Sequence, residues 1–191
     1  MRRIAIFASG SGTNAENIIK YFSTRNKAKV ELVLSNKREA YVLQRAEALG
    51  VNTHFFDRDD FYSGTKVLDI LHKNKIDFIV LAGFLWLIPA NILDEYQRRI
   101  INIHPALLPK YGGKGMYGER VHRAVIENRE TESGITIHYI DSRYDEGDII
   151  FQASCRVEPD DTPETLASKI HELEYKYFPV VIDDLAGRLS D

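Results

Sequence analysis

The alternation of short apolar runs with segments of helical periodicity constrains the fold of this chain more than any other feature. The apolar runs have the length of buried strands and cover residues 4–8, 30–34, 53–56, 78–82 and 100–104. Helical patterns follow at residues 14–22, 39–49 and 65–74, and Pro89 suits the first turn of another helix. Short strands that alternate with helices pair in parallel, and the helices cover both faces of the sheet.

The pattern changes in the last third of the chain. Residues 135–140 and 148–153 read as two further strands, and residues 141–147 between them fit a hairpin loop. We therefore predict an α/β fold, doubly wound and Rossmann-like, whose mostly parallel sheet carries an antiparallel C-terminal hairpin. No linker, low-complexity segment or repeat interrupts the pattern, so we expect residues 1–191 to form a single domain.

A helix should follow the hairpin. Thr162, Pro163 and Glu164 match the N-cap, N1 and N2 positions of a helix. We expect Pro179 to kink or break this helix, because proline removes a main-chain donor and its ring clashes with the preceding turn. The apolar stripe of the helix would consist of Leu166, Ile170, Leu173 and Tyr177.

Composition limits the partners and the compartment. The formal charge is −3 at pH 7, so the chain has no broad basic field for a nucleic acid. The longest apolar run, residues 78–88, is too short to cross a membrane. The single cysteine, Cys155, cannot form an internal disulfide, which favours a reducing compartment, the cytoplasm.

Metal-ligand patterns are also missing from the sequence, and we expect no metal. One cysteine gives no cysteine-based site, and the histidines other than His104 show no ligand spacing. We interpret these other histidines as structural or solvated, and they are His54, His72, His122, His138 and His171.

Two polar side chains mark the end of the strand at residues 100–104. Asn102 and His104 are two positions apart, so they project from the same face of the strand. Pro105 cannot donate to a sheet ladder, so the strand should stop beside the histidine. Ligands of open α/β sheets bind at such strand ends. A satisfied histidine in a strand-to-loop turn is the alternative, and this motif alone does not decide between them.

A glycine-rich loop, residues 10–15, joins the first strand to the first helix. Glycines allow a tight turn, and main-chain amides at a helix N-terminus bind phosphate, so we favour an anion site here. Two alternatives stay open. Residues 13–16 match a capping box, and residues 10–15 match the dinucleotide pattern G-x-G-x-x-A. An NAD site requires an Asp or Glu after the second strand to bind the ribose, and residues 35–38 contain neither. Arg38 could instead bind the 2′-phosphate of NADP.

An acidic turn, residues 144–148, joins the last two strands. Such a turn is usually solvated, but the tip of an edge hairpin can fold over the strand end that carries His104. A carboxylate beside that imidazole would favour its protonated form and orient the ring. Glu174, in contrast, lies in the middle of a helix, where a glutamate is more often a surface residue.

Three distant signals together resemble a known family. They are the loop at residues 10–14, the segment N-x-H-P with L-L-P-K-Y behind it, and D-x-G at residues 145–147. Their order and spacing are similar to those of the glycinamide ribonucleotide branch of the folate-dependent formyltransferases, over nearly the whole chain. The resemblance implies an enzyme of de novo purine biosynthesis. It would transfer the formyl group of the co-substrate 10-formyltetrahydrofolate to the amine of glycinamide ribonucleotide, two small-molecule substrates.

The resemblance also implies roles for individual residues. Asn102, His104 and Asp145 would be catalytic, and Glu174 would bind the amine or ribose end of the substrate. The substrate phosphate would be held by Gly12, Thr13 and Asn14. The folate would be bound by Leu85, Trp86, Leu87, Ile88, Asn102, Ile140, Asp141 and Asp145. The chain departs from the family pattern at Trp86, where a basic residue is frequent, and in the loop at residues 112–118.

Other functions compete with this interpretation. Methionyl-tRNA formyltransferases would need a further C-terminal domain and a basic surface, and formyltetrahydrofolate hydrolases an additional N-terminal domain. A sugar-nucleotide N-formyltransferase is harder to separate, although the glycine loop favours a simple phosphate substrate. An NADP-dependent oxidoreductase would rest only on that loop and Arg38, and a non-catalytic nucleotide-binding module would leave the polar residues unexplained. The oligomeric state stays open.

Overall fold

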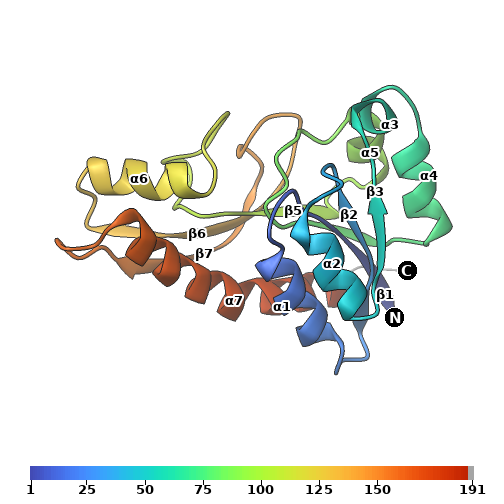
Figure 1. Cartoon of the computed structure of the whole chain (residues 1–191), viewed down its shortest axis with the longest axis horizontal. Coiled ribbons are helices and arrows are strands. Elements are labelled where there is room, and N and C mark those ends of the chain that lie inside the picture. Colours follow the sequence, from blue (N-terminus) through green and yellow to red (C-terminus); the bar gives the residue numbers. More distant parts are fainter. Residues whose placement is uncertain (189–191) are drawn as a thin grey trace.

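A computed structural model describes residues 1–188 and arranges their strands in one twisted sheet with helices on both faces (Figure 1). The strand order is β3-β2-β1-β4-β5-β6-β7. The bounds are β1 (Arg2–Phe7), β2 (Ala28–Ser35), β3 (Asn52–Phe55), β4 (Phe78–Leu81), β5 (Ile100–His104), β6 (Glu132–Tyr139) and β7 (Ile149–Arg156). The first five strands pair in parallel, and β6 and β7 are antiparallel, which confirms the predicted fold class.

The helices are α1 (Thr13–Phe22), α2 (Tyr41–Ala48), α3 (Arg58–Tyr62), α4 (Lys66–Lys73), α5 (Ala90–Glu95), α6 (Glu119–Glu127) and α7 (Pro163–Arg188). The sequence analysis did not predict α3 and α6. Helix α3 is a single short turn closed by a capping box between Asp57 and Asp60. Helix α6 is amphipathic and buries Val121, His122 and Val125, so its helical period was present in the sequence.

The order of the strands reverses between β1 and β4. From β1 the chain moves outward to β2 and β3, then returns across the sheet to β4 and continues to β5. At such a switch point the loops after the two central strands diverge and leave a crevice for ligands. The loops after β1 and β4 are tied together here, since the Ser9 amide donates to the Gly83 carbonyl at 3.0 Å.

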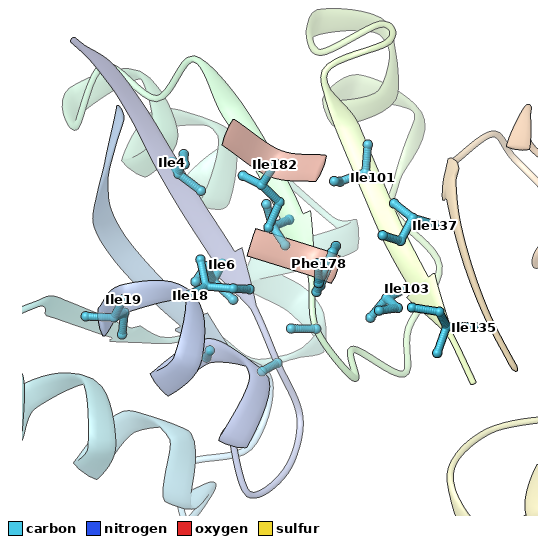
Figure 2. Close-up of a cluster of buried hydrophobic side chains, with 14 of the residues drawn as sticks. Ile4, Ile6, Ile18, Ile19, Ile101, Ile103, Ile135, Ile137, Phe178 and Ile182 are labelled. Atoms are coloured by element: carbon cyan, nitrogen blue, oxygen red, sulfur yellow. The ribbon is translucent and has the colours of Figure 1, made fainter. Parts of the chain in front are cut away.

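Each face of the sheet carries its own hydrophobic core, because neighbouring residues of a strand point to opposite faces. Ile6 of β1 belongs to the core beneath α1, α2, α6 and α7, together with Ile103, Ile137 and Phe178 (Figure 2). Phe7, the next residue of β1, belongs to the core on the other face, which is covered by α3, α4 and α5.

Helix α7 differs from its prediction in two respects. Thr162 caps it as expected, because its hydroxyl accepts from the Thr165 amide at 3.3 Å. Of the predicted kink or break at Pro179, the break is wrong, since the helix continues through this residue to Arg188. The predicted stripe is half correct: Leu166 and Ile170 are buried, but Leu173 and Tyr177 are only half-buried. The buried ridge continues instead through Glu174, Phe178 and Ile182.

This packing predicts that the stability of the chain depends on the inner face of α7. Replacing the fully buried Phe178 by alanine should lower the free energy of unfolding by about 3–5 kcal/mol, because a large cavity would remain. Val180→Ala is the matched control, since Val180 lies on the same helix and is 51% exposed. It should change stability by roughly 0.5 kcal/mol or less. Urea unfolding of both variants measures the difference, and similar losses would contradict the packing described.

Candidate active site

A cavity of about 540 Å³ lies at the carboxyl ends of β1, β4 and β5. The glycine loop after β1 lines one part of it, and the segments after β4 and β5 line another. The loop that leads to α6 and the middle of α7 complete the wall. The cavity therefore lies at the switch point of the sheet, where the sequence placed Asn102 and His104.

Four polar side chains form a cluster beside this cavity. His104 Nδ1 is 3.6 Å from Asp145 Oδ2, and the other oxygen of Asp145 is 3.7 Å from His138 Nε2. The side-chain nitrogen Nδ2 of Asn102 is 3.1 Å from the same His138 nitrogen. The structure therefore brings together the predicted residues Asn102, His104 and Asp145, and it adds His138.

His138 was interpreted from the sequence as structural or solvated, and the structure instead places it within the cluster. It is buried on β6 directly opposite Asn102 on β5. The predicted antiparallel edge could have revealed it, since polar residues facing each other on neighbouring strands share one site. His138 Nδ1 donates to the Tyr139 carbonyl at 2.8 Å, so in the neutral ring Nε2 accepts from Asn102. Asn102 keeps a second N–H for a ligand.

Burial decides the charge of the two imidazoles. It lowers the pKa of His104, and the nearby Asp145 carboxylate and the bond from Nε2 to the Tyr111 carbonyl at 2.7 Å only partly oppose this effect. Burial likewise lowers the pKa of His138. The expectation that Asp145 would favour a protonated His104 is therefore correct in direction but outweighed by the loss of solvation. A neutral His104 presents the lone pair of Nδ1 to Asp145.

The acidic turn is held over the strand end by its main chain and by Asp145. The Gly113 amide donates to Asp145 Oδ2 at 2.9 Å, which links the turn to the glycine-rich loop before α6. Asp145 itself has a left-handed φ of 57°, a conformation that aspartate tolerates better than most residues. Gly147 has no room for a side chain, because a Cβ there would lie 1.8 Å from the Tyr139 carbonyl oxygen. The spacing D-x-G thus has a steric origin.

The glycine loop presents an uncapped helix N-terminus to the cavity. The N-cap of α1 is Gly12, with a left-handed φ of 78°, and no side chain caps the helix. The alternative of a capping box at residues 13–16 is not formed, because Glu16 pairs with Arg45 and Lys20 instead. The loop is also held from α2: Arg45 Nε donates to the Ser11 carbonyl at 2.9 Å. The amides of a helix start held in this way can bind an anion.

Glu174 reaches the glycine loop from the far end of the chain. It is buried, contrary to the usual position of a helical glutamate. It accepts a hydrogen bond from the side-chain nitrogen Nδ2 of Asn14 at 2.8 Å. Burial raises the pKa of this carboxyl group, although the bond from Asn14 acts in the opposite direction. Both residues line the cavity.

The predicted folate residues surround a second, smaller cavity of about 60 Å³. It is lined by Trp86, Leu87, Ile88, Asn102, Ile140, Asp141 and Asp145, whereas Leu85 lines the larger cavity. Trp86 is half-buried and packs on Phe56 and Phe61, with ring centroids 6.2 and 5.9 Å apart. Asn102 and Asp145 line both cavities, so two ligands could meet at these two residues.

The interpretation of the glycine loop as a dinucleotide site finds little support in the geometry. Arg38 lies over the Phe55 ring at 4.3 Å and does not line the large cavity, so it is badly placed for a dinucleotide phosphate there. Within residues 1–188, no group of three or more His, Cys, Asp or Glu side chains could hold a metal ion. In the same part of the chain, no helix is both long and apolar enough to span a membrane.

Comparison with known proteins identifies the class of this chain. Residues 2–182 match the family model described as formyl transferase, so the chain belongs to the formyl transferase family. A phosphoribosylglycinamide formyltransferase of Bacillus subtilis is 35% identical over 98% of this chain and 96% of its own length. The chloroplastic phosphoribosylglycinamide formyltransferase of Arabidopsis thaliana is 38% identical over 95% of this chain. The chain spans 64% of the length of that plant relative.

Solved structures agree with this relationship. The phosphoribosylglycinamide formyltransferase of Anaplasma phagocytophilum has a TM-score of 0.89 and is 31% identical, with 98% of this chain and 87% of that chain covered. The enzyme of the same name from Bacillus halodurans has a TM-score of 0.87 at 35% identity, with 98% and 96% covered. Within its family, the chain is therefore placed among the phosphoribosylglycinamide formyltransferases.

The geometry predicts how the protonation of His104 depends on Asp145. The carboxylate raises the pKa of His104, so replacing Asp145 by asparagine should lower that pKa further and move the titration of the ring to more acidic pH. NMR titration of the imidazole resonances measures this shift. His54, whose pKa is lowered mainly by its own burial, is the internal control and should titrate alike in both proteins. An unchanged His104 titration would show that Asp145 does not act on the ring.

Proposed function

We propose that the chain transfers the formyl group of 10-formyltetrahydrofolate to the amine of glycinamide ribonucleotide. The observation that carries this proposal is the meeting of two cavities at Asn102 and Asp145, next to His104. The larger cavity has the helix N-terminus that a phosphate requires, and the smaller one adds apolar residues beside the same polar cluster, against which part of a pterin ring can pack. The names of the relatives in the same family support formyl transfer to phosphoribosylglycinamide, the acceptor of this pair.

The reaction needs three functions at the meeting point. The substrate amine forms a bond to the formyl carbon, and the carbonyl oxygen becomes negatively charged in a tetrahedral intermediate. The free N–H of Asn102 donates to this oxygen, and losing such a donor typically slows catalysis by about 100- to 1,000-fold. The bond from the formyl carbon to the folate nitrogen then breaks, and its electron pair stays on that nitrogen.

One proton must move from the substrate amine to the folate nitrogen. Asp145 accepts the proton of the attacking amine, directly or through a water molecule, because it is the carboxylate at the junction of the cavities. The lone pair of His104 Nδ1 faces Asp145 and can take up this proton, after which the imidazolium stabilises the oxyanion and protonates the leaving nitrogen. His138 keeps Asn102 oriented throughout.

The two cavities would hold the reactants in position for attack. The amides of Gly12, Thr13 and Asn14 bind the ribonucleotide phosphate, and Glu174 binds the sugar or amine end. The folate ring lies against the main chain of residues 85–88 and of residues 140–141, with Trp86 as part of the wall. Holding two substrates in line can contribute ~7–11 kcal/mol to a bimolecular reaction, so this arrangement is as important as the polar groups.

A single domain can perform this reaction, because one sheet supplies residues to both cavities. The cytoplasm remains our expectation for the compartment on the basis of the single cysteine, and plant relatives are named as chloroplastic. The net charge of −3 argues against a nucleic-acid partner.

The proposed chemistry predicts the kinetics of substitutions in the cluster. His104→Ala and Asp145→Asn should each lower kcat by about 100-fold or more and leave substrate binding nearly unchanged. The double variant should lose little more than either single one, because the two groups move one proton together. Spectroscopic assay of formyl transfer from the folate to glycinamide ribonucleotide measures these rates.

The same assay tests the reaction itself. His72→Ala, an exposed substitution on α4 outside the cavity, should retain wild-type turnover. A wild-type protein that formylates a sugar-nucleotide amine but not glycinamide ribonucleotide would contradict the proposed acceptor. Wild-type turnover of His104→Ala would contradict the catalytic assignment.

The glycine loop predicts a difference between two neighbouring glycines. In Gly12→Ala, the Cβ would lie 2.4 Å from Val42 Cγ2 in a left-handed conformation, so the loop must shift and ribonucleotide affinity should fall about tenfold or more. Gly10→Ala is the matched control, because no atom lies within 4 Å of its Cβ position. Calorimetric titration with the ribonucleotide and with a folate analogue measures both. Equal loss of the two ligands in Gly12→Ala would assign the loop to a different function.

A further inference from the structure

One buried polar side chain in the large cavity has no function in the proposed reaction. Among residues 1–188, six enclosed side-chain atoms have no hydrogen-bond partner, and two of them belong to residues that line this cavity, Asn14 and His122. Asn14 already donates to Glu174 and has a function at the phosphate loop. His122 has neither a partner nor a function so far.

The His122 ring is placed to use one nitrogen toward the cavity. The residue lies on α6, is 3% exposed and contributes to the cavity wall. Nδ1 is enclosed without a partner, whereas Nε2 is not enclosed and makes no hydrogen bond within the described part of the chain. A proton on Nε2 leaves only a lone pair unsatisfied at Nδ1 and presents an N–H donor to the cavity.

The surroundings of His122 keep this ring neutral. Burial, and to a smaller extent repulsion by His171, lowers its pKa to about 4, and Glu119 only partly opposes this shift. A neutral donor suits an uncharged hydroxyl group better than a phosphate, which prefers a cation.

The position of His122 assigns it to the middle of the substrate. It shares the cavity wall with His104 at the reacting end and with the glycine loop and Glu174, and its helix α6 packs against α7. The sugar of a ribonucleotide connects the phosphate at the glycine loop with the amine at His104. A hydroxyl group of this sugar is therefore the polar part of the substrate that lies nearest to α6.

We propose that His122 binds a ribose hydroxyl group of the ribonucleotide by donating a hydrogen bond from Nε2. This inference rests on the proposed function and adds a residue that selects the sugar. An apolar wall at this position would leave the hydroxyl desolvated and unpaired, so the donor distinguishes a ribose from a deoxygenated analogue.

The test compares two variants at this position with a matched control elsewhere. His122→Phe keeps the ring shape but removes both nitrogens, and His122→Gln restores an N–H near the position of Nε2. His54→Phe is the control, because His54 also has an enclosed nitrogen without a partner but lies on β3 outside this cavity. Calorimetry measures the Kd of glycinamide ribonucleotide and of its 2-deoxy and 3-deoxy analogues for each protein.

We expect His122→Phe to weaken ribonucleotide binding about tenfold, the effect of one hydrogen bond, whereas His122→Gln and His54→Phe bind within about threefold of wild type. One of the deoxy analogues should bind wild type and His122→Phe equally. Loss of affinity for the ribonucleotide and both analogues alike, or no loss at all, would overturn the proposal.

Two further results keep the test decisive. If His122→Phe does not fold, the ¹⁵N resonance of His122 Nε2 in the wild-type protein is measured instead. A shift of this resonance on titration with the ribonucleotide, but not with the relevant deoxy analogue, supports the proposal. Identical shifts with both ligands refute it. A wild-type protein that does not bind the ribonucleotide would refute the proposed function itself. Normal wild-type binding with an unaffected His122→Phe variant would refute only the assignment of His122.

Discussion

The sheet changes from parallel to antiparallel pairing at strand β5, and the site depends on this change. On one side β5 pairs in parallel with β4, which aligns its carboxyl end with the crevice at the switch point. On its other side β5 pairs antiparallel with β6, which sets Asn102 opposite His138 and turns the following hairpin loop back over His104. A fully parallel sheet would carry the chain after β6 away from the same crevice through a crossover. The carboxylate of Asp145 would then not face two imidazoles.

The cost of removing charge from water organises the interior of this site. Asp145 is the acid that lies between the two buried imidazoles of His104 and His138, and burial outweighs its charge at both rings. The rings therefore stay neutral, and each can donate through one nitrogen and accept through the other. Both rings face the acid, and the neutral His138 ring can in addition accept the hydrogen bond that orients Asn102. Glu174 follows the same rule, because its burial also favours the uncharged form.

The sequence predicted most of the fold because the strands are short and apolar. Strand β5 has its predicted bounds, and Asn102 and His104 lie where their spacing placed them. The errors have physical causes. The interpretation of His138 failed because its importance comes from a neighbouring strand. The buried face of α7 was predicted only in part, because it includes Glu174. A pattern of apolar residues does not detect a buried glutamate. Helix α6 was missed because one of its three buried positions is a histidine, which a pattern of apolar residues does not count.

The contact between Asn14 and Glu174 joins residues that are 160 positions apart, and this separation has a consequence for folding. During synthesis the glycine loop leaves the ribosome well before α7 does. Until residues 163–188 are available, the apolar face of the sheet that contains Ile6, Ile103 and Ile137 lacks one of its covering helices. Contacts between distant parts of a chain form slowly, and surfaces that wait for them are prone to aggregation. The glycine loop therefore gains its contact with Glu174 only after α7 has been synthesised, and chaperone binding before that point would protect the incompletely covered face.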